Sequence, residues 1–561
     1  MRGSASRDLH RVHLVGKPVL LGLMSKLQTP TAEPPVARVE RTAFAIGAIL
    51  LAVAGVAFVL FGTLNHDEGW YLYAARLVFE GELPYRDFVF YQAPLLPYIY
   101  GIPQLVSSGV ETGRWTSFAI SAGMCALAMR TAGQRGGAVA VGVFIAGILG
   151  SPLALWTLTS TRTEPLCALF LTTSVFFLTR PSAGRLDGEL AVLAGALAAA
   201  TRISMVPAAL YILIWALRRF ADSRTDAVRI AAPLVTVALV AGVVIFSGGF
   251  DRGWVNLVEI QSQRYEQFRD VRPITAFTWF WSRVDFLRRL GAEFGVVTVI
   301  SCLSAIGFLV TWIVQPAARS ASSRVSIGSS ISLLALIALI PNLVPRSAFT
   351  VYFVALLPLV LIVGGWGVAA LSRSLQTLRI DPRAIVPLSV LIMVGAVLIQ
   401  TITFDRQSAR WLRSSPSDLE LLRVAALEVE ARIPEEKELL TFDTYLAVEA
   451  HRYVPPGFEM SVFSWFPRRP AEDGQHLGLL TTDRLQGSFT DPAVGGAALS
   501  DVSLGVLVAK SHAGFRPKHV LTERDLWKLL QPLQDFQLAH QMKAFGQLHA
   551  PLYLLVRKES R

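Results

Sequence analysis

Residues 65–101 read NHDEGWYLYAARLVFEGELPYRDFVFYQAPLLPYIYG and follow an apolar run that ends at Gly62. That run has the roughly 20 residues that a helix needs to span a bilayer. Asp67 and Glu68 come directly after it, and adjacent carboxylates beside lipid are costly unless they have a partner or a function. The aromatic residues behind them are typical of a membrane interface, and the Gly and Pro residues break the segment into short pieces. The stretch therefore predicts a structured loop on the membrane surface with an acidic pair at its start.

The composition indicates a polytopic membrane protein. Of the 561 residues, 53% are hydrophobic and 17% are charged, whereas soluble proteins average about 25% charged residues. The net charge is +11, but the basic residues lie between apolar runs, so we reject nucleic-acid binding. The three cysteines, Cys125, Cys167 and Cys302, lie inside apolar runs, which indicates neither a disulfide framework nor a zinc site.

Apolar runs predict eleven membrane spans between residues 42 and 403. Residues 1–41 are predicted to be a cytoplasmic tail, because the apolar patch Val19–Met24 is too short to span and no signal-peptide cleavage site follows it. Met1 and Met24 are alternative starts of the chain. The predicted spans are Thr42–Gly62, Trp115–Met129, Gly137–Leu158, Pro165–Leu178, Leu190–Ala200, Ile203–Leu217, Ile230–Phe246, Phe294–Val314, Ile331–Leu343, Phe349–Leu371 and Ile385–Thr401.

The distribution of arginine predicts the orientation. Connections on one side carry two or more arginines each, and short connections on the other side carry one, as the positive-inside rule expects for a cytoplasmic N-terminus. The loop 63–114 and residues 404–561 are then extracytoplasmic. Strand-like runs at Glu438–Phe442, Val502–Lys510 and Leu552–Arg557 and helical runs at Asp418–Arg432 and Glu523–Leu533 predict that 404–561 is an α/β domain.

Polar residues at or near membrane depth gather on the outer face in this topology. Carboxylates and arginines from separate spans could there bind a phosphate while a carboxylate handles a proton. These residues are His66, Asp67, Glu68, Arg86, Asp87, Gln92, Arg162, Glu164, Arg202, Arg346 and Tyr352.

Four pieces of the sequence resemble the GT-C superfamily of membrane glycosyltransferases, across about residues 40–400. His66-Asp67-Glu68-Gly69 and GELPYRDFVFYQAPLLPYIYG (81–101) are similar to its first outer loop. Thr163-Glu164-Pro165, Thr201-Arg202 and PRSAFTVYFVALLPLV (345–360) follow in the family's order. The nearest types are the bacterial protein O-mannosyltransferases and aminoarabinose lipid A transferases, which use polyprenyl-phosphate sugars as donors.

The resemblance implies roles for individual residues. Asp67 matches the acid that acts as base toward the acceptor hydroxyl, with Glu68 as the alternative. Arg202 and Arg346 match positions that bind the lipid phosphate, and Tyr352 is expected to bind substrate with them. Glu164 matches a second-loop acid that orients acceptor or metal.

The sequence departs from the aminoarabinose branch at Gln92-Ala93-Pro94, where that branch has Glu-Lys-Pro. The branch's phosphate-binding lysine is absent, and Arg86 is the candidate replacement. Dependence on a divalent metal ion stays open, because His66, Asp67 and Glu164 form either a metal site or none.

Several alternatives stay open at this stage. A single acid after a span is often a solvated loop residue, and a single arginine at a helix end often reaches toward lipid headgroups. The competing functions are a transporter or flippase of lipid-linked saccharides, for which no repeated halves are seen, and a scaffold whose outer domain binds a partner. The leading prediction is an inverting glycosyltransferase of the cytoplasmic membrane. Its sugar and its glycan, lipid or protein acceptor have no linear signature.

Overall fold

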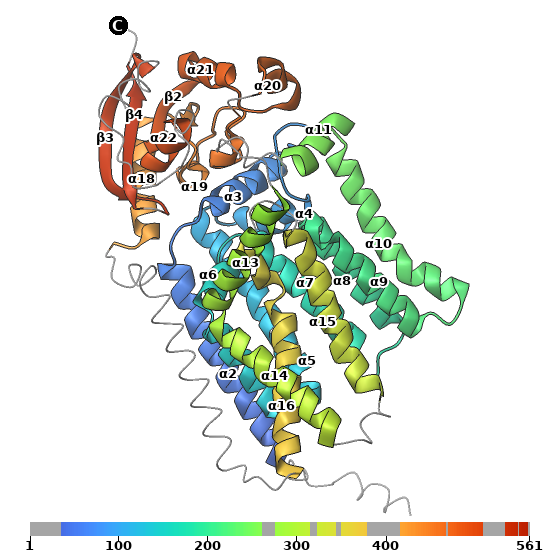
Figure 1. Cartoon of the computed structure of the whole chain (residues 1–561). Helices are drawn as coiled ribbons and strands as arrows, with labels where there is room; N and C mark the ends of the chain where they lie inside the picture. Colours follow the sequence, from blue (N-terminus) through green and yellow to red (C-terminus); the bar gives the residue numbers. More distant parts are fainter. Residues whose placement is uncertain are drawn as a thin grey trace, which may run out of the picture.

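A computed structural model gives the architecture as a helical bundle with a small α/β domain at one end (Figure 1). It describes residues 35–260, 275–314, 322–343, 349–377, 416–466, 469–508, 533–547 and 549–558. Predictions for Arg346, the span Ile385–Thr401, the domain boundary at 404 and most of the helix Glu523–Leu533 lie outside these ranges.

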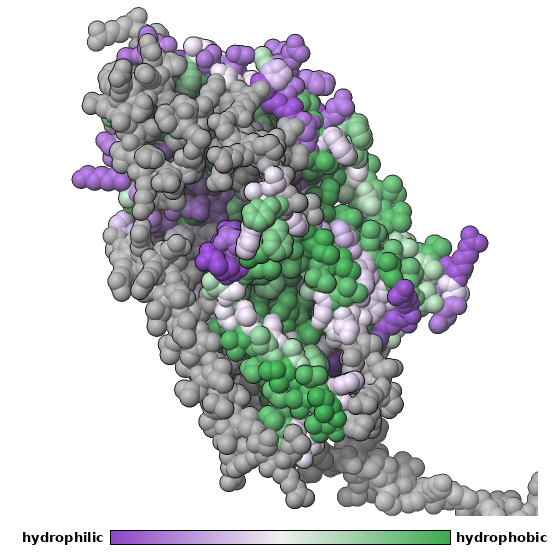
Figure 2. Space-filling model, in the orientation of Figure 1, coloured by the Kyte–Doolittle hydropathy of each residue, from purple (hydrophilic) through white to green (hydrophobic). Residues whose placement is uncertain are grey.

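Among the described residues, six helices are long and apolar enough to cross a membrane. They include or coincide with α2 (Pro35–Phe61), α5 (Val110–Leu149), α9 (Val206–Phe220), α10 (Arg224–Ile245), α14 (Gly295–Val314) and α16 (Leu357–Thr377). Shorter apolar segments are α7 (Thr163–Thr179) and the end of α15 (Ser322–Leu343), and α8 (Arg185–Thr201) packs beside α7. Figure 2 shows apolar residues over much of the visible face of the bundle, as expected for a surface in contact with lipid. The chain is therefore a multi-pass membrane protein.

The second and third predicted spans are joined in one element, α5. Gly137 has φ 59° and ψ −154°, so it interrupts the helix at the point where the third predicted span begins. Such a conformation is accessible to glycine because it lacks Cβ. The third predicted span also ends differently: α5 stops at Leu149 and a separate helix, α6 (Pro152–Thr159), follows.

Short helices cover the domain end of the bundle. The segment after α2 forms α3 (His66–Phe79) and α4 (Leu95–Gln104), and further chain segments add η1 (Ile203–Met205), α11 (Phe250–Trp254), η2 (Val255–Glu259) and η4 (Thr350–Ala355). The longer helix α13 (Ala276–Glu293) precedes α14. The sequence 65–68, Asn-His-Asp-Glu, starts α3 with a capping box. Asn65 Oδ1 accepts a hydrogen bond from the Asp67 amide at 3.0 Å, and Glu68 Oε1 accepts one from the Asn65 amide at 3.1 Å.

The C-terminal domain contains a mixed four-stranded sheet in the order β1-β2-β4-β3. β1 (Glu438–Leu440) is parallel to β2 (Val494–Ser500), and β4 (Ala550–Arg557) is antiparallel to both β2 and β3 (Phe536–Phe545). The helices are α18 (Asp418–Arg432), α19 (Thr444–Glu449), η5 (Ser461–Ser464), α20 (Ala471–Leu477), α21 (Thr482–Thr490) and α22 (Asp501–Val508).

The predicted strand at Val502–Lys510 is wrong, because Asp501–Val508 forms the helix α22. The Ser503 amide donates to Ser500 Oγ at 3.2 Å, which is the contact of a helix N-cap. The predicted helix Asp418–Arg432 and the strands near Glu438 and Leu552 match α18, β1 and β4.

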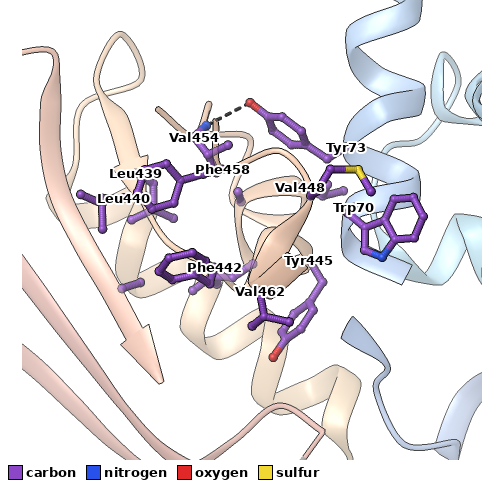
Figure 3. Close-up of a cluster of buried hydrophobic side chains, with 14 of the residues drawn as sticks. Trp70, Tyr73, Leu439, Leu440, Phe442, Tyr445, Val448, Val454, Phe458 and Val462 are labelled. Atoms are coloured by element: carbon purple, nitrogen blue, oxygen red, sulfur yellow. Dashed lines mark hydrogen bonds between the residues drawn. The ribbon is translucent and has the colours of Figure 1, made fainter. Parts of the chain in front are cut away.

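The C-terminal domain packs directly on α3 (Figure 3). The amide of Val454 donates to Tyr73 Oη at 3.0 Å, and that of Leu64 donates to Asp418 Oδ2 at 2.9 Å. One hydrophobic cluster includes side chains of α3 and of the domain: Trp70, Tyr73, Leu439, Leu440, Phe442, Tyr445, Val448, Val454, Phe458 and Val462. The C-terminal domain therefore helps to hold α3, the helix that carries Asp67, in place.

Candidate active site

Asp67 lies in the first turn of α3, where the capping box fixes the backbone. Its Oδ1 accepts a hydrogen bond from Trp70 Nε1 at 3.2 Å, one helical turn later. Oδ2 faces Arg162 Nη2 at 2.9 Å. The side chain of Asp67 is 20% exposed, more than the other charged groups around it.

The charged side chains around Asp67 come from two helix ends in the bundle, the start of α7 and the end of α8. Arg162 is the N-cap of α7 with extended backbone, and Glu164 follows in the first turn of that helix. Arg202 is the C-cap of α8, where the chain passes into η1. A carboxylate in the first turn is favourable because it faces the positive end of the helix dipole. These helix ends bring three separate chain segments to one place.

The four side chains form one alternating network. Arg162 Nε donates to Glu164 Oε2 at 3.2 Å, and Arg202 Nη1 donates to Glu164 Oε1 at 2.8 Å. Together with the pair of Arg162 and Asp67, the order is Asp67, Arg162, Glu164, Arg202. Two positive and two negative charges balance, which makes this cluster tolerable at low exposure.

Aromatic rings surround the network. Arg202 Cζ lies 3.7 Å from the centre of the Tyr352 ring, and Arg162 Cζ lies 5.8 Å from that of Trp156. Both are within cation–π range. The pKa of Tyr71 on α3 is raised, first by burial and then by the carboxylates of Asp67 and Glu164. Tyr71 is therefore a neutral phenol beside the two acids.

Sequence reasoning listed Arg162 among the polar residues of the outer face without giving it an individual role, and it missed Arg114 entirely. Arg114 is buried in α5 and holds Glu68 with two hydrogen bonds, from Nε to Oε2 at 2.8 Å and from Nη2 to Oε1 at 2.7 Å. The Glu68 side chain has 0% exposure. The Asn-x-x-Glu pattern of a capping box was the signal in the sequence that the Glu68 side chain turns back toward the start of its own helix.

One other predicted site residue, Arg86, has its charged partner outside this network. The half-exposed guanidinium of Arg86 pairs with Asp87, with Nη2 and Oδ2 2.7 Å apart. Arg346 is not among the described residues. The structure thus brings Asp67, Glu164, Arg202 and Tyr352 together.

The candidate metal ligands do not fit a metal ion. Within the described parts of the chain, no group of three or more His, Cys, Asp and Glu side chains is arranged to hold one. Asp67 and Glu164 both contact the Arg162 guanidinium, which would repel a divalent cation. His66 faces Asp443 of the C-terminal domain, with Nδ1 and Oδ1 3.8 Å apart.

Comparison with solved structures identifies the fold. ArnT from Cupriavidus metallidurans bound to undecaprenyl phosphate superposes with a TM-score of 0.55, over 91% of this chain and 97% of that chain, at 12% identity. The same protein in the apo state gives a TM-score of 0.54 at 13% identity, over 91% and 98% of the two chains. The chain has the fold of ArnT. This confirms the predicted GT-C resemblance at the level of the fold.

A weaker match is the Archaeoglobus fulgidus oligosaccharyltransferase in complex with Zn and sulfate, with a TM-score of 0.42, 13% identity and coverage of 82% of this chain and 68% of that one. No protein-family model matches the sequence, and no curated protein is significantly similar to it.

Proposed function

We propose that the chain is a membrane glycosyltransferase that moves a sugar from a polyprenyl-phosphate donor to an acceptor hydroxyl, with inversion at the anomeric carbon. The observation that carries this proposal is the network of Asp67, Arg162, Glu164 and Arg202. It combines a carboxylate that is accessible to a hydroxyl with guanidinium groups that match the geometry of a phosphate. The ArnT fold supports the donor class, since that protein was solved with undecaprenyl phosphate.

Asp67 is the base in this proposal. The acceptor oxygen forms a bond to the anomeric carbon while the bond from that carbon to the phosphate oxygen breaks, and its electron pair leaves with the polyprenyl phosphate. The hydroxyl proton moves to Asp67. Glu68 is a poor alternative because Arg114 holds both of its oxygens.

Arg162 and Arg202 stabilise the charge that develops on the leaving phosphate. Preorganised cations aimed at developing charge are an effective form of catalysis, because they need little rearrangement during the reaction. The ring of Tyr352 contacts the Arg202 guanidinium, Glu164 joins the two arginines, and Arg346 is proposed as a further phosphate contact. Arg86 is the candidate replacement for the phosphate-binding lysine that the aminoarabinose branch has and this chain lacks.

The topology proposed for this reaction has eleven spans within 42–403, a cytoplasmic N-terminal tail, and the catalytic loop 63–114 and the domain 404–561 outside the cytoplasmic membrane. The donor then lies with its lipid chain in the bilayer and its phosphate at the interface. The acceptor is a glycan, a lipid or a protein that approaches from the extracytoplasmic side.

A transfer assay in proteoliposomes tests the proposal. Radiolabelled hexose and pentose donors linked to undecaprenyl phosphate are supplied with cell-envelope extract as a source of acceptors. We expect a covalent labelled product, and Asp67→Asn is expected to lower its rate about 10²- to 10⁴-fold, the usual contribution of a general base. Asp187→Asn is the matched control. Asp187 is a carboxylate paired with Arg180 at 2.7 Å, at the opposite end of α8 from Arg202.

Two results would overturn the proposal. Full activity of Asp67→Asn would show that Asp67 is not the base. Movement of the lipid-linked sugar across the membrane without any covalent product would favour a flippase.

A further inference from the structure

We propose that Asp67 and the donor phosphate compete for Arg162, so that donor binding releases the base. Glu164 is the permanent link between the two arginines and is not displaced. This inference rests on the proposed function and adds an order of events to it: the donor engages first, and Asp67 then accepts the acceptor's proton.

Asp67 is not ready to act as a base while Arg162 holds it. Oδ1 accepts from Trp70 Nε1 at 3.2 Å, and Oδ2 lies 2.9 Å from Arg162 Nη2. A carboxylate paired with a guanidinium is a weaker base, because the ion pair stabilises its charged form. When Arg162 turns to another anion, the carboxylate loses this ion pair and becomes a stronger base, while the Trp70 contact keeps it oriented.

The two carboxylates of the network differ in how easily they can be exchanged. Glu164 is 2% exposed and accepts from both Arg162 and Arg202. A buried carboxylate that loses such partners has no water to replace them, so its displacement is costly. Asp67 is 20% exposed, so water can reach its carboxylate when the arginine turns away. Asp67 is therefore the group that a phosphate can replace.

The two arginines also differ in the strength of their aromatic contacts. Arg202 is stacked on Tyr352 at 3.7 Å, whereas Arg162 lies 5.8 Å from the centre of its aromatic neighbour, Trp156. Cation–π attraction weakens with this distance, so the aromatic contact of Arg162 is the weaker of the two, and one of its ion pairs is with the more exposed Asp67. A phosphate bound to Arg202 would reach the adjacent Arg162 and offer it more charge than Asp67 does.

Equilibrium binding of undecaprenyl phosphate to the purified full-length chain in nanodiscs tests the inference without any sugar or acceptor. Asp67→Asn is expected to bind this lipid about tenfold more tightly, because the phosphate no longer competes with a carboxylate for Arg162. Tenfold corresponds to the strength of about one charge-assisted hydrogen bond. Glu164→Gln is expected to bind it more weakly, because the two arginines lose their link. General electrostatics would instead tighten binding in both variants, since each removes one negative charge.

A double-substitution cycle locates the competition at Arg162. Arg162→Gln is expected to weaken binding, and adding Asp67→Asn to it should then have no further effect. Asp187→Asn is the control, because it removes a paired carboxylate elsewhere and should bind like wild type. Thermal unfolding of every variant checks that the fold is retained, and any variant with a lowered Tm is replaced by Asp67→Ser or Glu164→Met.

The outcomes separate this inference from the proposed function. If wild type binds no undecaprenyl phosphate, the donor class is wrong and both proposals fail. If wild type binds the lipid but Asp67→Asn binds it no more tightly, or tightens equally in the Arg162→Gln background, the competition is refuted and the proposed function stands.

Discussion

Arg114 of α5 and Glu68 of α3 form a buried two-fold ion pair, with Nε–Oε2 and Nη2–Oε1 distances of 2.8 and 2.7 Å. The remaining donors of Arg114 point at carbonyls in and just after the last turn of α2, with Val59 O at 3.3 Å, Gly62 O at 2.8 Å and Thr63 O at 2.9 Å. One guanidinium thus ties the end of the first span, the start of α3 and α5 together. The acid next to the proposed base therefore has a structural contact of its own.

This pair predicts a large loss of stability when one partner is removed. Arg114→Met leaves the Glu68 carboxylate buried without its cation, which typically costs about 3–5 kcal/mol. We expect a clearly lower apparent Tm in detergent, and partial recovery on adding Glu68→Gln. Glu80→Gln is the control, because it removes an exposed partner of Arg76, and exposed pairs contribute less than about 1 kcal/mol. Equal losses in Arg114→Met and Glu80→Gln would contradict the structural role of Arg114.

How far the site could be predicted follows from where its residues lie. Glu164 and Arg202 stand at the ends of apolar runs, so charge and hydropathy alone drew attention to them. Arg114 sits at the end of a predicted span, where an arginine is ordinary, and its partner is 46 residues earlier. Nothing local encodes that pairing, because it arises when α3 packs against α5.

The secondary structure divides in the same way into parts that the local sequence predicts and parts that it leaves open. The predicted helix at Asp418–Arg432 has its own caps and is found with those bounds. Residues 501–508 are apolar enough for a buried strand or a buried helix, and periodicity does not separate these for a short run. Ser500 and Asp501 were the local signal for a helix start, and they decide the case for α22.

The ring of Tyr352 predicts a selective effect on donor binding. Because Arg202 Cζ lies 3.7 Å from the ring centre, Tyr352→Leu removes a cation–π contact, which corresponds to about three- to thirtyfold weaker binding. Tyr352→Phe keeps the ring and should bind undecaprenyl phosphate almost like wild type. Titration of that lipid against the three proteins in nanodiscs gives the dissociation constants. A loss in Tyr352→Phe as large as in Tyr352→Leu would show that the hydroxyl matters and the ring does not.

Glu459 predicts a pH-dependent stability of the C-terminal domain. Burial raises the pKa of its carboxyl to about 7, although the Gly457 amide donates to it at 2.8 Å. Between about pH 4.5 and 7 the folded protein keeps this proton and the unfolded chain does not, so stability falls as pH rises through this range. Above pH 7 the full penalty is present, up to about 3 kcal/mol.

Glu459→Gln should remove that penalty, because its side chain is neutral at every pH and still accepts from Gly457. The apparent Tm of the variant should exceed that of wild type at pH 8 and equal it near pH 4.5. Glu472→Gln on the exposed start of α20 is the control and should follow the wild-type curve. A Tm difference between Glu459→Gln and wild type that does not change with pH would contradict the assigned cause.

Gly69 predicts that the packing of α3 on the C-terminal domain controls the site. A Cβ at this position would lie 2.2 Å from the backbone nitrogen of Tyr445 and 2.6 Å from Thr444 Oγ1. Backbone cannot move aside as a flexible side chain can, so Gly69→Ala must push α19 away from α3, at a typical cost of about 1–3 kcal/mol. Gly69 is two residues after Asp67, so we expect sugar transfer to fall together with Tm, and the domain to become more sensitive to limited proteolysis.

Gly291→Ala in α13 is the control, because a Cβ there meets nothing within 4 Å, and alanine favours a helix over glycine. If Gly69→Ala retains wild-type transfer and protease resistance, the domain does not hold α3 in place, and its role must lie elsewhere, such as contact with the acceptor.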